Sequence, residues 1–375
     1  MNVAGLIFAN IHDNSLPELT RVRNMASVPF GGRYRLIDFT LSNMVNSGIN
    51  KVGIITHYNY QSLLDHLGNG KDWDLARHEG GIKLIPPNVS AAGAGHLPSS
   101  RLESMLSAID FISRCNEEYL VLSDCDIICN LDLSKVIEAH TASGADVTFV
   151  TKQVDTSGMY LTEALGCVTA DEDGRITEFV MKKPSGIVNL YTNIMVVTRA
   201  YLVGMLADAA ARGYTSFFHD VIARVVADGT ANYRAYEYHG WYAYVGSLED
   251  YFSASMKLLT SEARTGLFGV KNRPVLTKVR NSAPTKYCEG AKVVNSVVAD
   301  GCIIEGTVEN SILARGVKVG RGTVIRNSIL LQDTYTGSDV TLNCVVTDKN
   351  VVIRDGRNLS GCDIMPVFIE KGRSV

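Results

Sequence analysis

Residues 309–331 read ENSILARGVKVGRGTVIRNSILL, and this stretch decides the fold of the last part of the chain. Apolar side chains recur at every sixth position, at Leu313, Val319, Ile325 and Leu331, with glycines between them. A six-residue period with three short strands in each coil is typical of a β-helix. Each coil of such a solenoid buries its apolar ladder by stacking on the next coil. We therefore predict a parallel β-helix here.

The same pattern extends beyond this stretch in both directions. Four segments share it: VNSVV (294–298), ENSIL (309–313), RNSIL (326–330) and LNCVV (342–346). Their polar anchors are 15, 17 and 16 residues apart, at Ser296, Ser311, Ser328 and Cys344. The six-residue period returns at Val340, Val346 and Val352. We place the β-helix over residues 288–375; a flat all-β domain is the alternative.

The first 250 residues follow a different pattern, in which strand-like and helix-like segments alternate. Short apolar runs predict strands at 3–8, 51–56, 82–85, 119–123 and 146–151. Apolar residues at helical spacing predict helices at 36–46, 60–67, 101–112 and 133–141. The alternation predicts a doubly wound, mostly parallel, Rossmann-like α/β sheet over residues 1–254, with ligands at the carboxyl ends of its strands. The polar, turn-rich residues 255–287 are predicted to be the linker.

The composition excludes several classes of protein. Of 375 residues, 46% are hydrophobic and 20% charged, which is ample for buried cores. The net charge of −3, without a basic stripe, offers nucleic acid or an acidic membrane no attraction. The N-terminus lacks signal-peptide features and no run of about 20 apolar residues occurs, so we expect a cytoplasmic protein outside membranes. The eight scattered cysteines, without a CxxC pair, predict free thiols rather than a zinc site.

Four motifs carry a resemblance to a known family. They are VPFGGRYRLIDFTLSNMVNSGI (28–49), HLGNGKDWDL (66–75), GGIKLIPP (80–87) and VVTDKNVVIRDG (345–356). With them the chain resembles ADP-glucose pyrophosphorylase, also called glucose-1-phosphate adenylyltransferase. The resemblance implies a nucleotidyltransferase sheet first and a left-handed β-helix last. It also implies synthesis of ADP-glucose and pyrophosphate from ATP and glucose 1-phosphate, the committed step of bacterial glycogen synthesis.

The nucleotide loop departs from this family. Catalytic members carry a GGxGxRL-type loop after the first strand, whose backbone N–H groups approach the triphosphate. Here residues 8–20 read FANIHDNSLPELT, without glycine, lysine or arginine. We expect Asp13 and Glu18 to place negative charge where the triphosphate would sit. In the family's following RAKP motif, Met25 stands at the position of the lysine.

The metal-binding residues depart as well. Nucleotidyl transfer needs Mg²⁺ held by carboxylates, and the family uses one Asp after a central strand and a second in a W-x-DVG motif. The resemblance places the first at Asp126 of VLSDCDII (121–128). Tyr244 of WYAYVGS (241–247) replaces the second, and a phenol is a poor Mg²⁺ ligand. The resemblance thus implies a remnant metal site at Asp126, weak binding of Mg²⁺ and no intact catalytic set.

The sugar-phosphate motif is mixed. The family's FxEKP motif supplies a Glu for the glucose hydroxyls and a Lys for the phosphate. Here FVMKKP (179–184) keeps Lys183, but Lys182 replaces the Glu, and YTNIM (191–195) has lost the family's glycine. The resemblance implies that Lys183 binds an anionic substrate group; a solvated lysine is the alternative.

An effector site is implied between the two domains. Arg23, Arg35 and Lys349 match family residues that contribute to an anionic effector pocket, and guanidinium groups suit a sugar phosphate or inorganic phosphate. Ordinary ion pairs are the alternative for these residues. For Asp38 we expect helix capping or packing, for Trp73 a loop anchor, and for the histidines, which lack ligand spacing, structural roles.

Departures at three catalytic parts favour a regulatory, catalytically impaired subunit. The family resemblance then implies a catalytic adenylyltransferase subunit as partner, in a hetero-oligomer that is a tetramer. One alternative is an active adenylyltransferase with an unusual ATP loop. A second is a stand-alone β-helix scaffold that binds a sugar phosphate.

Overall fold

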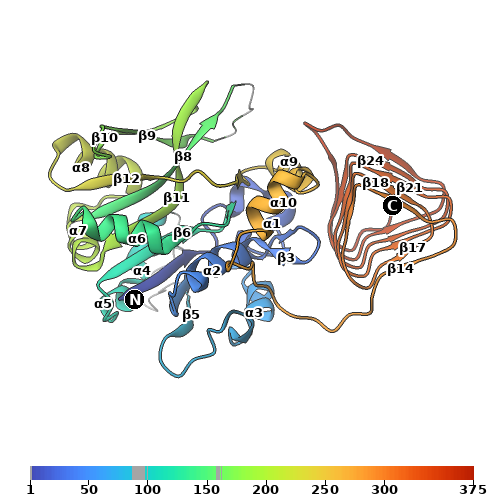
Figure 1. Cartoon of the computed structure of the whole chain (residues 1–375), viewed down its shortest axis with the longest axis horizontal. Helices are drawn as coiled ribbons and strands as arrows, with labels where there is room; N and C mark the ends of the chain where they lie inside the picture. The colour runs from blue at the N-terminus through green and yellow to red at the C-terminus, as the bar shows by residue number, and fades with distance from the viewer. Residues whose placement is uncertain (1, 87–97, 99, 158–160, 162) are drawn as a thin grey trace.

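A computed structural model describes residues 2–86, 98, 100–157, 161 and 163–375 of the chain, so Pro87 of the GGIKLIPP motif lies outside the described residues. The described chain forms two parts, an α/β unit followed by a stack of flat coils (Figure 1). No helix within these ranges combines the length and the apolar character that crossing a membrane requires.

A nine-stranded sheet forms the centre of the α/β unit. Its main path runs in the order β10 (Ile176–Lys182), β9 (Leu165–Ala170), β11 (Ile187–Thr198), β6 (Tyr119–Asp124), β1 (Val3–Phe8), β4 (Lys51–Ile55) and β5 (Gly81–Ile85). Two further strands, β8 (Val147–Asp155) and β12 (Tyr233–Glu237), join it through β11. Strands β6, β1, β4 and β5 are parallel, as the alternating pattern predicted. Strand β11 runs antiparallel to β6 and begins the other half of the sheet.

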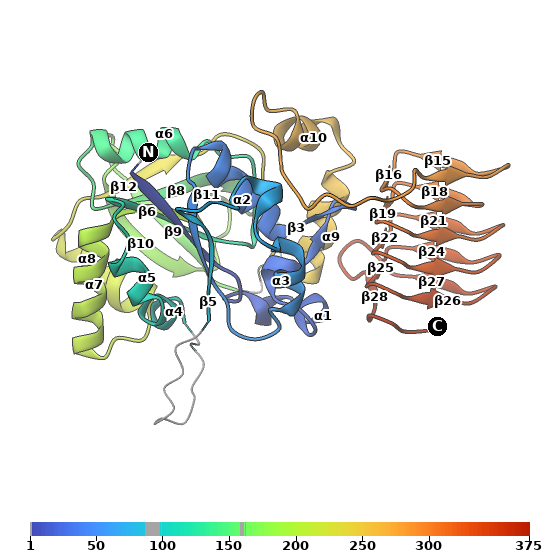
Figure 2. The ribbon, with the colours of Figure 1, turned by 90° about the horizontal axis from the view of Figure 1, so that it is seen from below.

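Helices cover both faces of this sheet, which confirms the doubly wound prediction. The face nearer the coils carries α2 (Leu36–Asn46), α3 (Gln61–Leu67) and α6 (Leu133–Ala142). The other face carries α4 (Arg101–Ser107), α5 (Ile109–Ser113), α7 (Arg199–Arg212), the π-helix η4 (Phe217–Ile222) and α8 (Ala223–Asp228) (Figure 2). The single helix predicted over 101–112 is divided at Ala108. The hydroxyl groups of Ser104 and Ser107 donate to backbone carbonyls three or four residues earlier, which competes with the regular helical ladder.

The C-terminal coils confirm the predicted parallel β-helix. One sheet contains β14 (Lys286–Tyr287), β17 (Ile303–Ile304), β20 (Lys318–Val319), β23 (Tyr335–Thr336) and β26 (Val352–Ile353). A second contains β15 (Lys292–Val294), β18 (Thr307–Glu309), β21 (Val324–Arg326), β24 (Thr341–Asn343) and β27 (Asn358–Ser360). The third contains β16 (Val297–Val298), β19 (Ile312–Leu313), β22 (Ile329–Leu330), β25 (Val345–Thr347) and β28 (Val367–Ile369).

The predicted ladder of apolar residues at every sixth position points into the core in the first coils. In the last coil the predicted residue points outward. Leu313, Val319 and Ile325 point into the buried core of the β-helix. Val352 is 39% exposed, whereas its neighbours Val351 and Ile353 are buried. Strand pairing explains the difference, because Lys318, Tyr335 and Val352 follow one another at 17 residues and not at the 18 of three full hexads. The six-residue period therefore slips by one position along the chain.

The linker in the structure is shorter than the predicted 255–287. The predicted range includes the end of α9 (Leu248–Lys257) and the whole of α10 (Ser261–Phe268). Ala263 and Leu267 of α10 are buried in the core of the α/β unit. The connection that follows is also held to that unit. Arg273 Nη2 donates to the Leu131 carbonyl at 2.5 Å, and the Leu276 N–H donates to Ser42 Oγ at 2.8 Å.

The two parts of the chain share an apolar contact. The third sheet of the β-helix faces the α/β unit (Figure 2), and its Ile312, Ile329 and Val346 belong to the same buried cluster as Leu258 and Phe30. The β-helix is therefore packed against the α/β unit and is not a separate module on a free tether.

Candidate functional site

Two buried carboxylates follow the central strand β6. Asp124 ends the strand and Asp126 comes two residues later; both are fully buried, as is Cys125 between them. Because β1 and β6 are adjacent and parallel, the segment after β1 meets the segment after β6 at one edge of the sheet. Only Asp126 was expected at this edge from the sequence, and the structure places Asp124 there as well.

His12, from the segment after β1, lies against both carboxylates. Its Nε2 is 2.7 Å from Asp124 Oδ2 and 3.3 Å from Asp126 Oδ2. The three residues bring together ligand types that bind metal ions. The histidine spacing in the sequence did not indicate this contact, because Asp124 and Asp126 are distant from His12 along the chain.

Arg101, the first residue of α4, completes the group. Its Nη2 donates to the same Asp124 Oδ2 that contacts His12. Its guanidinium carbon lies 5.0 Å from the ring centre of Phe8 and 5.3 Å from that of Phe218, so two aromatic rings hold the cation in place. We call His12, Arg101, Asp124 and Asp126 the acid–base cluster.

A bulge in β11 turns an amide toward the acid–base cluster. The pairing of β11 with β8 shifts between Tyr191 and Met195, and Asn193 adopts a φ of +58° within the shift. Its Nδ2 donates to Asp126 Oδ2 at 3.0 Å. A bulge of this kind redirects a side chain that a regular strand would point elsewhere.

The charges of the acid–base cluster shift one another's titration. Burial alone would lower the pKa of His12, but the charges of Asp126 and Asp124 outweigh it and raise that pKa to about 9. Burial would raise the pKa of Asp124, but Arg101 and His12 hold it below its usual value. Burial and the neighbouring Asp124 charge raise the pKa of Asp126 despite His12.

Tyr244 lies beside this group, as its position in the family motif implied. Strand β13 (Tyr242–Tyr244) pairs with β7 (Ile127–Cys129), which places Tyr244 opposite Ile127. The Val245 N–H donates to the Asp126 carbonyl at 2.8 Å. Burial, followed by the charge of Asp126, raises the pKa of the Tyr244 phenol far above its usual value, so it stays neutral and is no substitute for a carboxylate.

The segment at 8–20 is folded onto itself. It contains η1 (Asp13–Ser15) and α1 (Pro17–Thr20), and the N–H groups of Asp13, Ser15 and Leu19 donate to carbonyls of the same segment. Backbone donors spent in this way do not point at a phosphate. Glu18 is exposed on α1.

Asp13 is held by its own segment and by Met25. It is buried and accepts from the Met25 N–H at 2.6 Å and from Asn10 Nδ2 at 2.6 Å, so its effect on a triphosphate stays a prediction. Burial raises the pKa of Asp13 to about 7, although both hydrogen bonds oppose the shift. Met25 itself packs in the apolar core, so the position of the family lysine holds a core residue.

The two lysines of the sugar-phosphate motif are exposed. Lys182 ends β10 and Lys183 follows it, and neither forms an ion pair within the described ranges. This geometry leaves the assignment of Lys183 to substrate as a prediction.

The three predicted effector residues come together where the two parts of the chain meet. Arg23 is already paired: Nη2 lies 2.8 Å and 2.9 Å from the two carboxylate oxygens of Asp348, and both side chains are buried. Arg35 Nη1 donates to the carbonyl and hydroxyl of Ser62. Lys349 is half-buried; burial and the nearby charges of Arg35 and Arg23 lower its pKa to about 7.

One cation of this group was not expected from the sequence. The charge of Arg280, from the connection to the β-helix, also acts on Arg35 and on Lys349. After burial, the charge of Arg280 contributes to the lowered pKa of Arg35, and the charges of Arg35 and Arg280 contribute to that of Lys349, so an anion at this place would be stabilised. We call Arg35, Arg280 and Lys349 the interdomain cationic group. Arg23 lies close by, but Asp348 neutralises its charge, and it is not counted in the group.

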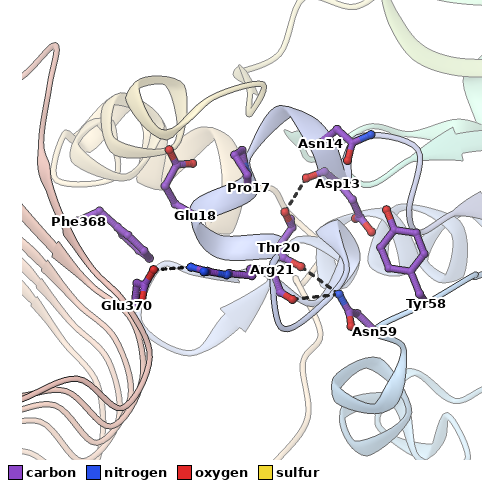
Figure 3. Close-up of a pocket in the computed structure, with 10 residues that line it drawn as sticks. All are labelled: Asp13, Asn14, Pro17, Glu18, Thr20, Arg21, Tyr58, Asn59, Phe368 and Glu370. Atoms are coloured by element: carbon purple, nitrogen blue, oxygen red, sulfur yellow. Dashed lines mark hydrogen bonds and ion pairs between the residues drawn. The ribbon is translucent and has the colours of Figure 1, made fainter.

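A cavity of about 500 Å³ also lies between the two parts of the chain (Figure 3). Residues of η1, α1 and β28 line it, and Arg21 pairs with Glu370 across it. Asp13, Glu18 and Glu370 give the lining more acidic than basic groups. This cavity is therefore unsuited to an anion and is distinct in character from the interdomain cationic group.

Two further expectations are confirmed. Asp38 Oδ2 accepts from the Arg35 N–H at 2.9 Å at the start of α2, which is the expected capping role, and Asp38 Oδ1 lies 2.6 Å from His66 Nε2. Trp73 is fully buried against the edge of the His66 ring, as a loop anchor would be.

The fold and this edge of the sheet define a class, a nucleotidyltransferase-type α/β domain joined to a hexapeptide β-helix. The family described as "Nucleotidyl transferase" matches residues 14–261, and the family described as "GlmU-like, C-terminal hexapeptide" matches residues 283–364.

Individual relatives narrow the class. The chain is 33% identical to "Glycogen biosynthesis protein GlgD" of Bacillus subtilis (strain 168) over 98% of this chain and 95% of that protein. It is 36% identical to the protein of the same name from Geobacillus stearothermophilus over 86% and 82%. It is 33% identical to "Glucose-1-phosphate adenylyltransferase" of Clostridium botulinum (strain Eklund 17B / Type B) over 87% and 84%. The chain belongs to the glucose-1-phosphate adenylyltransferase family.

Proposed function

We propose that this chain is a regulatory, catalytically impaired subunit of glucose-1-phosphate adenylyltransferase, which acts in glycogen synthesis by assembling with a catalytic paralogue. The observation that carries the proposal is the state of residues 8–20. In this segment the N–H groups of Asp13, Ser15 and Leu19 donate to carbonyls of the same segment, and Asp13 accepts from the Met25 N–H. A triphosphate would need those donors free, because preorganised N–H groups stabilise the charge of a transferring phosphoryl group.

Two further features support the proposal. Tyr244 stands beside Asp126 as a neutral phenol, and Met25 is a core residue. The relatives named glycogen biosynthesis proteins span most of the chain, which supports a role in the same process. The buried contact between the β-helix and the α/β unit supplies a continuous scaffold on which a partner subunit can assemble.

We further propose that the interdomain cationic group binds a sugar phosphate or inorganic phosphate. Arg35, Arg280 and Lys349 supply the positive charge, and an anion would relieve their mutual repulsion. Arg23 lies beside the group but would not pair with the anion, because its Nη2 already donates to both carboxylate oxygens of Asp348.

An active adenylyltransferase is the second candidate. Matches to several proteins with that name and the paired carboxylates after β6 favour it. Co-expression with a catalytic homologue, followed by a pull-down and kinetics, separates the candidates. A regulatory subunit co-purifies with the homologue and changes its kinetics. A stand-alone scaffold binds phosphate without the homologue, and an active enzyme releases pyrophosphate by itself.

A further inference from the structure

The acid–base cluster brings two buried carboxylates together with the guanidinium of Arg101 and the imidazole of His12. Asp124 and Asp126 are fully buried, and Arg101 is 4% exposed. A buried ionised carboxylate is costly unless a cation or hydrogen-bond donors compensate its charge. In a nucleotidyltransferase that cation is a divalent metal ion, which makes the fit of a metal to these residues the decisive question.

The residues present do not fit Mg²⁺. This ion prefers six oxygen ligands in octahedral geometry and usually retains several waters. Here His12 Nε2 lies against the Oδ2 atoms of both carboxylates. Asp124 Oδ2 also accepts from Arg101. An imidazole nitrogen is a poor ligand for Mg²⁺, and a guanidinium group in the first contact shell repels a dication.

The remaining polar atoms point to the same conclusion. Within the described part of the chain, Asp124 Oδ1 and Asp126 Oδ1 are buried acceptors without a hydrogen bond, and Arg101 Nε and Nη1 are buried donors without one. Unpaired donors and acceptors in one small space suit a bridging water, which serves both. A metal ion would serve the acceptors but oppose the donors.

We infer that His12 and Arg101 take the place of the divalent cation at these carboxylates, so that the acid–base cluster is complete without a metal ion. Arg101 is held from two sides by Phe8 and Phe218, and it ties α4 to the end of β6. His12 ties the segment after β1 to the same point. The position that a metal ion would occupy then acts as a structural contact that joins α4, the end of β6 and the segment after β1. This inference does not rest on the proposed regulatory role, since it concerns the chain alone.

The test uses the full-length chain, with Mn²⁺ as a spectroscopic probe and thermal melting as a second readout. For the wild-type chain we expect no Mn²⁺ bound at the cluster by electron paramagnetic resonance, and the same melting temperature in Mg²⁺ and in EDTA. For Arg101→Ala we expect a lower melting temperature that Mn²⁺ or Mg²⁺ partly restores. The variant should also bind Mn²⁺ at least about tenfold more tightly than the wild type, and this binding should disappear when Asp126→Asn is added.

Two controls keep the result interpretable. Arg212→Ala removes an exposed arginine paired with Asp208 and should change neither readout. His12→Gln removes the imidazole that lies against both carboxylates and should gain a metal response in the same direction, which provides a second test if Arg101→Ala fails to fold. The wild-type measurement decides by itself: one Mn²⁺ per wild-type chain, abolished by Asp126→Asn, overturns the inference whatever the variants do.

Discussion

The ion pair between Arg23 and Asp348 should be among the most sensitive points of the structure. It joins the α/β unit to the β-helix across 325 residues of sequence, and each side chain is 2% exposed. Arg23 also donates to the Leu19 carbonyl at 3.0 Å, and Asp348 accepts from the Lys349 N–H at 2.7 Å. Asp348→Asn would leave the guanidinium buried without a counter-charge. Breaking a buried pair by removing one partner typically costs about 3–5 kcal/mol.

The assay is urea unfolding followed by circular dichroism, with limited proteolysis of the connection at 269–285 as a second measure. We expect Asp348→Asn to lower the free energy of unfolding by about 3–5 kcal/mol and to speed cleavage of the connection. The matched control is Asp208→Asn, which breaks an exposed pair with Arg212 four residues away and should cost at most about 0.5 kcal/mol.

A double variant separates charge from packing. Arg23→Met with Asp348→Leu replaces the pair by apolar groups of similar size, and it should recover much of the stability lost in Asp348→Asn. A loss below about 1 kcal/mol in Asp348→Asn, within the range of an exposed pair, would refute the reasoning. It would mean that Arg23 finds water or another partner and is free to serve an effector.

Two other predictions concern the sites themselves. Tyr244→Asp alone should give no pyrophosphate release from ATP and glucose 1-phosphate, because residues 8–20 and Met25 are unchanged; appreciable turnover in this variant means that the closed loop is not the obstacle. Sulfate, whose charge is constant near neutrality, should bind the interdomain cationic group more weakly as the pH rises from 6 to 8.5. The pKa of Lys349 in the free chain is about 7. Above pH 7 the neutral amine must therefore take up a proton when sulfate binds. The affinity for sulfate is full below pH 7 and falls by at most about tenfold per pH unit above pH 7. Calorimetry on the wild type and on Lys349→Met checks this, and an equal pH dependence in both would exclude Lys349 as the cause.

Local sequence patterns predicted the elements whose signal is local. Helix α2 occupies the predicted 36–46, because its apolar residues are at helical spacing and Gly48 follows its end. The β-helix was predicted for the same reason, from a repeat that each coil expresses by itself. The antiparallel strands β9 and β10 were not predicted, because their pairing depends on neighbours brought together by the whole fold.

The candidate site was predicted less completely than the fold. Asp124 could have been found, since it stands two residues before Asp126 and both follow the predicted strand at 119–123. Arg101 and Asn193 could not have been found in this way. Arg101 is brought to Asp124 by the start of α4, and Asn193 is turned toward Asp126 by the bulge in β11. The charge of Asp13 was visible in the sequence, whereas the hydrogen bond that it accepts from the Met25 N–H was not.

One measurement tests the central claim most directly: Mg²⁺-dependent pyrophosphate release from ATP and glucose 1-phosphate by the purified chain, first alone and then mixed with a catalytic glucose-1-phosphate adenylyltransferase from the same genome. We expect no turnover by the chain alone and a changed dependence of the partner's rate on substrate or phosphate effector in the mixture. Turnover by the chain alone, lost in Asp126→Asn, would instead establish the chain as an active enzyme.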